Sequence, residues 1–454
     1  METKPRHSRR EFLKTSAAAV LGTAAVGSKL AALEPRAGEG QARSGFRAKP
    51  LSVVRVGFVG VGGMGSAHVQ NFLNIEGVEV KAVCDIVPAK VERVQKWVVE
   101  AGKPEPAGYD RGPWDFKRLC ETEDLDLVLT ATPWEWHVPV CVAAMKNGKH
   151  AATEVPAAST LDECWELVET AEKTKLHCVM MENCCYDRVE LMVLHLVRQG
   201  LLGEILHAEC GYLHDLREVK FASQGEGLWR RQHSWRRNAN LYPTHGLGPV
   251  AQTMNINRGD AFDWLVSLSS PSRGLQEYAV AKFGPDSAQA KERFALGDVN
   301  TSLIKTKLGK TVIVIHDTNL PRPYSRVNLV QGTKGITEKY PNPLVYIEGR
   351  SPQHQWEPLL ETYAAEYEHP LWKAIASRGE GRGHGGMDYI EDYRLVQCLR
   401  QGEPLDMDVY DAAAWSVVTA LSERSVAQKG KPQAFPDFTR GLWKTNPPLG
   451  IIGG

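Results

Sequence analysis

The sequence lacks an excess of either charge. Fifty-four lysine and arginine residues balance fifty-four aspartate and glutamate residues, so the formal net charge at pH 7 is zero. A balanced chain is not drawn by its overall charge to nucleic acid or to an anionic membrane. We therefore expect a small-molecule partner and no nucleic-acid partner.

Paired cysteine motifs are also missing. The nine cysteines are an odd number, and no two of them have the CxxC spacing. This argues against a zinc ribbon and against a disulfide scaffold, and buried thiols that pack as small apolar groups are the ordinary interpretation. Histidines, cysteines and carboxylates show no recognisable metal spacing, so a metal is not expected.

The N-terminal segment has no apolar run long enough to span a bilayer. Residues 17–26 supply about half of the roughly 20 residues that a transmembrane helix needs. The preceding string SRREFLK, with Arg9 and Arg10, resembles a twin-arginine export signal. We assign residues 1–50 to a signal peptide and linker cleaved between Gly27 and Ala42. The expected location is the periplasm or the medium, reached through the twin-arginine machinery without a stable membrane span.

A glycine-rich motif follows a short apolar run. Residues 53–59 predict a buried parallel strand. Next comes GVGGMG, which places Gly60, Gly62 and Gly65 at the three glycines of GxGxxG. These glycines allow a tight turn and close approach to a pyrophosphate at a helix N-terminus.

An acidic residue ends the second predicted strand, over residues 78–84. Asp85 lies twenty residues beyond Gly65, where a carboxylate holds the ribose hydroxyls of NAD and repels the extra phosphate of NADP. A structural turn aspartate is the alternative interpretation of Asp85.

Strands and helices continue to alternate as far as residue 180. Residues 125–130 predict a further central strand, and residues 138–147 predict a helix. Between them TPWEWH places Trp134, Glu135, Trp136 and His137 at the carboxyl edge of the sheet, where open α/β sheets bind ligands. Capping and packing are the alternative roles for these side chains. We predict a Rossmann domain over residues 51–180, with a doubly wound parallel sheet.

The alternation stops near residue 181. Longer alternating stretches at 205–212, 303–308 and 311–316 predict a companion sheet. We predict a C-terminal α+β domain over residues 181–454, with a mostly antiparallel open sheet, and a cleft where the two domains meet. The overall class is α/β.

The order of these motifs resembles the glucose-fructose oxidoreductase and inositol dehydrogenase superfamily. The motifs follow one another in the order GxGxxG, aspartate, TPxxxH, GKH and E-x-P. The last motif, here residues 154–156, normally reads EKP in that superfamily, and its lysine is catalytic. This chain has Val155 in the lysine position. Since valine cannot transfer a proton, other residues must do so.

Further strings resemble glycoside hydrolase family 109, the NAD-dependent α-N-acetylgalactosaminidases. They are EVP, MENCCYDR at 181–188, CGYLHDLR at 210–217, NLYPTHGLGP at 240–249 and DTNLPRPYSR at 317–326. Together with the glycine turn, the resemblance implies NAD as the cofactor, contacted by Gly63, Met64, Asp85, Trp134 to His137, Glu154, Val155 and Asn183. It implies sugar contacts at Tyr212, Arg230, Tyr242, Pro243, Thr244, His245 and Tyr324.

The string YPTHG places a phenol and an imidazole three residues apart. Histidine is the commonest general acid or base near neutral pH. We predict that His245 and Tyr242 carry the proton transfers, with Glu154 and then Tyr186 as further candidates. A structural histidine and sheet-packing tyrosines are the alternatives, and the roles within the set of four stay open.

The resemblance implies hydrolysis through transient oxidation. NAD would take a hydride from carbon 3 of the sugar, loss of the carbon 2 proton would expel the substituent on carbon 1, and water addition and hydride return would follow. NAD-dependent glycosidases are exceptions to the scheme with two carboxylates. The alternatives are an NAD-dependent sugar oxidoreductase with net hydride transfer and an exported sugar-binding protein. The sequence leaves open which glycan and which aglycone are involved. It also leaves open the oligomeric state, including whether the protein is a homo-oligomer.

Changing Arg9 and Arg10 together to lysine should leave an active enzyme in the cytoplasm, because the export signal depends on the arginine pair. Cell fractionation with an activity assay measures this. Undiminished export of the double variant would refute the twin-arginine assignment.

Overall fold

A computed structural model of the protein describes residues 46, 48–379, 383–448 and 451. The predicted twin-arginine signal lies outside the described residues. No helix in the described part of the chain is long and apolar enough to cross a membrane. The elements below belong to one unit, residues 42–454.

The first sheet is parallel throughout, with the strand order β3-β2-β1-β4-β5-β6. Its strands are β1 (Val54–Val59), β2 (Val78–Cys84), β3 (Ala107–Tyr109), β4 (Leu127–Thr130), β5 (His150–Thr153) and β6 (Cys178–Met180). Strand β4 is buried along its whole length, as expected where helices cover both faces of a parallel sheet. The predicted doubly wound sheet is confirmed.

Five helices connect these strands. They are α2 (Gly63–Leu73), α3 (Pro88–Glu100), α4 (Asp115–Thr122), α5 (His137–Lys146) and α6 (Leu161–Thr174). Helix α6 begins at a capping box in which Thr160 and Glu163 satisfy each other's backbone amides. Helix α2 begins at Gly63, within the glycine-rich motif.

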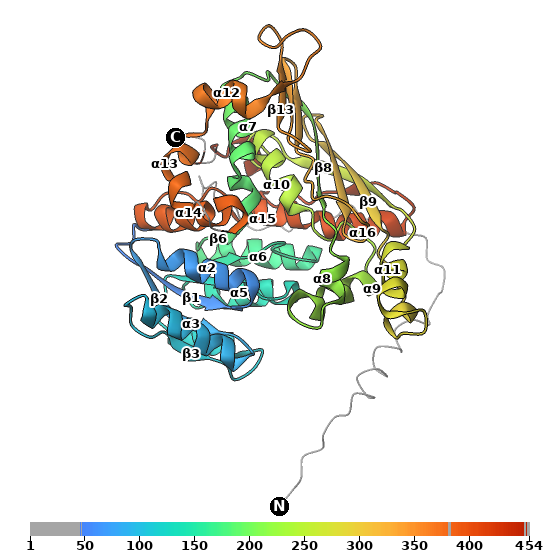
Figure 1. Ribbon diagram of the computed structural model, residues 1–454. Helices are drawn as coiled ribbons and strands as arrows, with labels where there is room; N and C mark the ends of the chain where they lie inside the picture. The colour runs from blue at the N-terminus through green and yellow to red at the C-terminus, as the bar shows by residue number, and fades with distance from the viewer. Residues whose placement is uncertain (1–45, 47, 380–382, 449–450, 452–454) are drawn as a thin grey trace, which may run out of the picture. The chain divides into compact units, whose positions relative to one another are not determined.

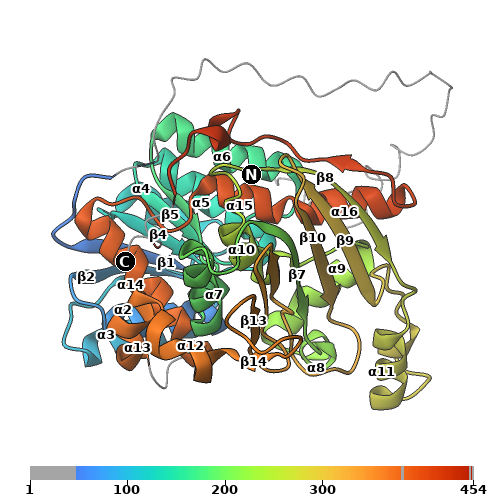
Figure 2. The same ribbon diagram turned by 90° about the horizontal axis from the view of Figure 1, so that it is seen from above.

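The second sheet has nine strands in the order β14-β13-β12-β11-β7-β10-β9-β8-β15. Figures 1 and 2 show this sheet, with β8, β9 and β13 labelled in both. They are β7 (Ile205–Leu213), β8 (Phe262–Ser269), β9 (Val299–Thr306), β10 (Thr311–Asp317), β11 (Leu329–Gly332), β12 (Gly335–Glu338), β13 (Leu344–Ile347), β14 (Glu357–Pro358) and β15 (Gln433–Ala434). Neighbouring strands are antiparallel except β7 and β10, which run parallel. This confirms the mostly antiparallel companion sheet.

Helices from the C-terminal part of the chain pack on the Rossmann domain. The helices after the first sheet are α7 (Arg188–Arg198), α8 (Arg217–Phe221), α9 (Arg230–Arg236), α10 (Thr244–Thr253), α11 (Gly274–Phe283), α12 (Leu359–Tyr367), α13 (Pro370–Gly379), α14 (Met387–Gln401), α15 (Val409–Ser416) and α16 (Val418–Ala427). Helix α14 lies against α2 and β1, and α15 lies against α6 and β6 (Figure 1). One apolar core therefore runs through both sheets. The division of the chain at residue 180 stays a prediction.

The glycine turn after β1 is shaped by close packing. Gly60 has φ +80°, a region that favours glycine. A Cβ on Gly65 would clash with the carbonyl oxygen of Gly60, whereas a Cβ on Gly63 would meet nothing within 4 Å. Gly65 is thus required for packing, and Gly63 faces open space.

Gly65→Ala should lower the free energy of unfolding by about 1–3 kcal/mol, although alanine is the better helix former by about 1 kcal/mol. Gly63→Ala is the matched control and should be as stable as the parent or slightly more stable. Urea unfolding measures both. Equal losses in the two variants would contradict the assigned packing role of Gly65.

Candidate active site

The glycine turn fits a dinucleotide pyrophosphate. Helix α2 has no acidic residue in its first turn, and Gly62 at its N-cap makes no side-chain cap, so the first amides are open to an anion. A Cβ on Gly62 would approach only the Lys90 Nζ, at 3.8 Å. Met64 lies in the same turn. The chain thus leaves room for a phosphate where the resemblance places the cofactor.

Asp85 ties this turn to the end of β2. Its Oδ2 accepts a hydrogen bond from the Val61 amide at 3.0 Å, and its Oδ1 accepts one from the Val87 amide at 3.0 Å. The Nζ of Lys90 lies 3.7 Å from Oδ1. Both contacts with the backbone suit a structural aspartate, and carboxylate oxygens have further lone pairs for a ribose hydroxyl. The ribose contact stays a prediction.

The two tryptophans of TPWEWH point to different neighbours. The ring of Trp134 lies 4.7 Å from His233 and 5.7 Å from Tyr242. The ring of Trp136 packs 4.8 Å from Trp114, an exposed residue of the Rossmann domain. Between them Glu135 is largely exposed. Only Trp134 of this pair is thereby brought beside the predicted sugar residues.

His137 holds the two predicted cofactor loops together. Its Nδ1 lies 2.8 Å from the Pro156 carbonyl and its Nε2 lies 2.9 Å from the Thr132 carbonyl. Burial lowers the pKa of His137. Both ring nitrogens are therefore occupied by backbone, and the side chain acts as a clamp between the segments after β4 and β5.

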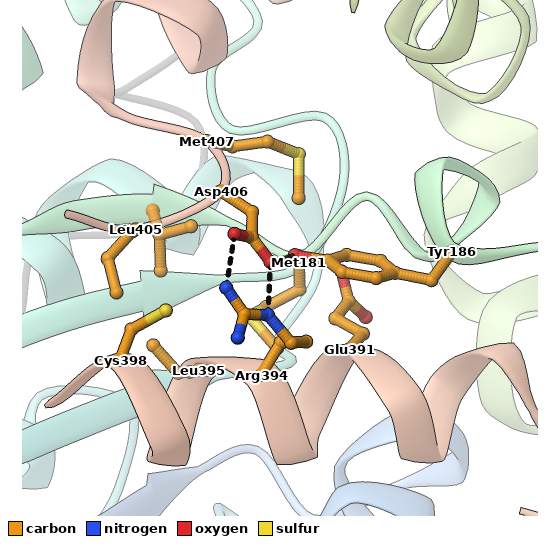
Figure 3. Close-up of a pocket in the computed structure, with 10 residues that line it drawn as sticks. Met181, Tyr186, Glu391, Arg394, Leu395, Cys398, Leu405, Asp406 and Met407 are labelled. Carbon is orange, nitrogen blue, oxygen red and sulfur yellow. Dashed lines mark hydrogen bonds and ion pairs between the residues drawn. The ribbon is translucent and has the colours of Figure 1, made fainter. Parts of the chain in front are cut away.

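Tyr186 is the predicted catalytic residue that lies apart. Its hydroxyl donates a hydrogen bond to Asp406 at 3.2 Å. It borders an internal hollow of about 10 Å³, room for a single water molecule, beside Arg394 and Glu391 (Figure 3). Burial raises the pKa of Tyr186 well above its usual range. These contacts suit a structural role, and its catalytic role stays a prediction.

Five predicted residues do come together, as an aromatic site formed by Trp134, Tyr212, Tyr242, His245 and Tyr324. The Tyr212 ring lies 4.6 Å from Tyr242, 5.4 Å from His245 and 6.2 Å from Tyr324. Tyr212 is near the end of β7, and His245 is in the first turn of α10. Burial raises the pKa of Tyr212 to about 12, so its phenol stays protonated near neutral pH.

Two glycines allow this meeting of β7 and α10. A Cβ on Gly246 would clash with the backbone of Gly211, so the first turn of α10 presses directly on the strand. Their neighbours in sequence, His245 and Tyr212, are therefore brought side by side. Pro243 and Thr244, which complete the predicted sugar-binding string, are buried at the start of α10.

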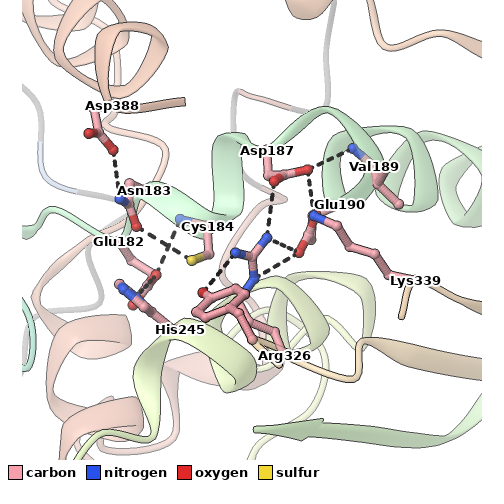
Figure 4. Close-up of polar contacts among 11 residues, drawn as sticks. Glu182, Asn183, Cys184, Asp187, Val189, Glu190, His245, Arg326, Lys339 and Asp388 are labelled. Carbon is pink, nitrogen blue, oxygen red and sulfur yellow. Dashed lines mark hydrogen bonds and ion pairs between the residues drawn. The ribbon is translucent and has the colours of Figure 1, made fainter. Parts of the chain in front are cut away.

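His245 is held by a carboxylate from the other sheet. Its Nδ1 lies 2.7 Å from Glu182 Oε1, just beyond β6 (Figure 4). Burial would raise the pKa of Glu182, but the imidazole lowers it overall, so the carboxylate is ionised. The Nδ1–H donates to it, and Nε2 has no hydrogen-bond partner among the described residues. His245 thus offers one free nitrogen.

Arg230 stands over the aromatic site. Its guanidinium carbon lies 5.0 Å from the Trp134 ring and 5.2 Å from the Tyr242 ring, and its Nε pairs with Glu226 at 2.7 Å. At the opposite side, the hydroxyl of Tyr324 accepts a hydrogen bond from Arg326 at 3.0 Å. The guanidinium of Arg230 is thus held by the aromatic rings and by the carboxylate of Glu226.

Glu154 reaches the same edge of the first sheet through a buried histidine. Its Oε1 lies 2.8 Å from His68 Nε2, and the Nδ1 of His68 lies 2.8 Å from Asp392 on α14. Burial alone would lower the pKa of His68, but the two carboxylates raise it well above its usual range. Val155, the next residue, is buried. His68 and Asp392 were not among the predicted residues.

A second unpredicted histidine is linked to Asn183. The Asn183 amide donates to Asp388 at 2.7 Å, and the other oxygen of Asp388 lies 2.7 Å from His384 Nδ1. His384 has a left-handed backbone, with φ 49°. A histidine set among glycines in GHGG is the sequence signal that could have drawn attention to it.

One group of three possible metal ligands exists among the described residues. Atoms of Glu182, Cys184 and His245 lie within 4.8 Å of one another. Burial raises the pKa of the Cys184 thiol well above its usual range, which disfavours the thiolate that a metal needs. The expectation of no metal stays a prediction.

The fold and the site define the class of protein: a Rossmann domain joined to a mostly antiparallel sheet, with polar aromatic residues gathered at the strand ends. Residues 54–182 match the family "Oxidoreductase family, NAD-binding Rossmann fold", and residues 186–445 match "Glycosyl hydrolase 109, C-terminal domain". A glycosyl hydrolase family 109 protein of Shewanella baltica is 48% identical, over 98% of this chain and 99% of the relative. An α-N-acetylgalactosaminidase of Shewanella oneidensis is 47% identical with the same coverage. The chain belongs to glycoside hydrolase family 109, which confirms the resemblance and makes it a glycoside hydrolase.

Solved structures support the fold. The scyllo-inositol dehydrogenase of Lactobacillus casei with bound NAD(H) and scyllo-inositol is 14% identical, with a TM-score of 0.60, over 84% of this chain and 99% of that one. A levoglucosan dehydrogenase in complex with NADH and levoglucosan is 19% identical, with a TM-score of 0.64 and the same coverage. At these identities the likeness concerns the fold alone.

Asp388→Asn should lower the pKa of His384 toward its usual value near 6.5, because the hydrogen bond and charge of Asp388 raise it. A raised folded pKa stabilises the protein below about pH 6.5, and this stabilisation is lost as the pH rises through the raised value. NMR titration of the His384 ring measures the shift.

The matched control is Asp110→Asn, which removes an exposed carboxylate. It should leave the titration of His384 unchanged. An unchanged pKa of His384 in Asp388→Asn would show that the two side chains are not paired in solution.

Proposed function

We propose that the protein is an exported glycosidase that removes terminal α-N-acetylgalactosamine from glycans, with NAD as a regenerated cofactor. The observation that carries the proposal is the position of His245. Glu182 beyond the first sheet fixes its Nδ1, and the rings of Tyr212 on β7 and Tyr242 before α10 pack against its ring. The name of the Shewanella oneidensis relative supports the choice of sugar.

The residues present fit NAD. Gly60, Gly62, Gly63, Met64 and Gly65 would hold the pyrophosphate, and Asp85 the ribose; Trp134, Glu154 and Asn183 are at the carboxyl edge where the nicotinamide would lie. When bound, NAD supplies a hydride acceptor for carbon 3 of the sugar and later returns the hydride. Matching of residues 54–182 to an NAD-binding family supports this choice.

The residues of the chain manage the protons. The free Nε2 of His245 is suited to take the proton from carbon 2, because Nδ1 is committed to Glu182. Burial raises the pKa of Tyr242 well above its usual range, so its phenol is protonated and can donate to an oxygen of the sugar. Tyr212, Arg230 and Tyr324 bind and orient the ring. Glu154 is the further candidate acid or base.

Net oxidation is less well supported than hydrolysis. The resemblance to the oxidoreductase superfamily implies a catalytic lysine in the E-x-P segment, and here Val155 is apolar and buried there. Export through the twin-arginine route agrees with a cofactor that is loaded in the cytoplasm and regenerated in each turnover. The alternative function is an NAD-dependent dehydrogenase with net hydride transfer.

In heavy water the released N-acetylgalactosamine should carry deuterium at carbon 2, since that proton leaves the sugar in each turnover and the base exchanges with solvent. Mass spectrometry and NMR of the product measure this. A direct displacement through paired carboxylates never breaks that bond. Product without deuterium would contradict the elimination step.

His245→Ala should lower the rate of hydrolysis by about a hundredfold or more if His245 is the general base. Glu182→Gln should give a smaller loss, because the histidine remains but is no longer held by a charge. His207→Ala, on the far end of β7, is the matched control. If His245→Ala hydrolysed a nitrophenyl glycoside at the control's rate, His245 would have no part in the chemistry.

A further inference from the structure

A surface groove away from the aromatic site carries positive charge. It has a volume of about 420 Å³, in the range of ligand-binding pockets, and lies between the start of α11 and the segment before β9. Arg273 and Arg293 line it, together with Asn238, Ser270, Gln276 and Phe294. We name it the arginine groove.

No carboxylate is among the residues that line the arginine groove. The guanidinium of Arg273 donates only to the carbonyl of its neighbour Ser272, at 2.8 Å, and Arg293 has no ion pair among the described residues. Arg273 and Arg293 are exposed, whereas the buried Arg326 pairs with the carboxylate of Glu190. Two arginines without an acid partner favour an anionic ligand.

Two carboxylates of neighbouring segments are already engaged. Asp298 is buried, and its Oδ2 accepts hydrogen bonds from the amides of Arg273 and Gly274, at 2.7 and 2.9 Å. Glu292 pairs with Arg231 and accepts a hydrogen bond from Trp235. Asp298 thus caps α11, and neither acid is bound to a guanidinium of the groove.

The remaining lining suits a saccharide. Phe294 is half-buried and supplies an apolar ring. The Ser270 hydroxyl already bonds to the backbone of Pro271 and Val299, and the Gln276 amide has only a long contact of 3.5 Å with the Ala290 carbonyl. Asn238 uses its carbonyl oxygen for the Gly297 amide, which leaves its NH₂ to donate. Few fixed polar groups beside an aromatic ring, with guanidinium forks for an acid, match an acidic sugar.

The groove is connected to the aromatic site by α9. The helix begins at Arg230, whose guanidinium lies over Trp134. Further along it, the backbone carbonyl of Ser234 accepts hydrogen bonds from the amides of Ala295 and Leu296 beside the groove. A seven-residue helix is only about 10 Å long. One extended glycan could therefore reach from the aromatic site to the groove.

We propose that the arginine groove binds an acidic sugar, bearing a sulfate ester or a carboxylate, in the glycan whose terminal residue occupies the aromatic site. The choice of a saccharide rests on the proposed function. The groove takes no part in bond breaking, and it favours acidic glycans over neutral ones.

Binding to the full chain with its cofactor tests the proposal. The probes are 3′-sialyllactose and galactose 6-sulfate, compared with lactose and galactose, in calorimetric titrations with excess N-acetylgalactosamine to occupy the aromatic site. At least one acidic probe should bind about tenfold more tightly than its neutral counterpart, and added salt should weaken it. Whichever acidic probe binds identifies the sulfate or the carboxylate as the source of the charge.

The variants are Arg273→Gln and Arg293→Gln, singly and together, with Arg350→Gln as an exposed control on another loop. The double variant should lose about tenfold or more in affinity for the acidic probe, and the control should lose none. Unchanged affinity in the double variant, or equal binding of neutral and acidic probes, would overturn the proposal. This readout needs no turnover. Its failure is therefore distinguishable from failure of the proposed function, which is tested by hydrolysis of the nitrophenyl glycoside and by its cofactor dependence.

Discussion

A single buried imidazolium fixes the position of the candidate active site. His68 follows the glycine turn on α2 and lies 2.8 Å from Glu154 and 2.8 Å from Asp392. Removing one partner of such a buried pair leaves an unpaired charge, at a cost of about 3–5 kcal/mol. The turn, the E-x-P segment and α14 are therefore held together, and Glu154 cannot move without breaking this contact.

The site itself is assembled from both sheets. Glu182 follows the last strand of the first sheet, and His245 begins the helix that presses on β7 of the second. The carboxylate fixes one nitrogen of the imidazole, and the tyrosines keep their protons because burial raises their pKa. In the proposed mechanism, proton transfer is carried by His245 and Tyr242, because Val155 stands where the resemblance places a catalytic lysine.

Local patterns in the sequence predicted the elements well and the long-range contacts poorly. Apolar β-branched runs gave β1 and β2, but β3 has three residues, AGY, too few for a periodic signal. Spacing in sequence also predicted Tyr242 and His245 as neighbours. Pairs such as Glu182 with His245, or His68 with Asp392, join residues 63 and 324 positions apart. Only the tertiary packing brings them together. For the same reason the pattern TPWEWH did not show that Trp134 and Trp136 point to different neighbours.

The central claim is that hydrolysis depends on a cofactor that is regenerated in every turnover. The most direct measurement follows nitrophenol and NADH together while the protein acts on a nitrophenyl α-N-acetylgalactosaminide, first with its cofactor and then after the cofactor is removed. The account predicts steady hydrolysis without accumulation of NADH, loss of hydrolysis in the cofactor-free protein, and recovery on adding NAD. Full hydrolysis by the cofactor-free protein, or one NADH released for each sugar consumed, would contradict it.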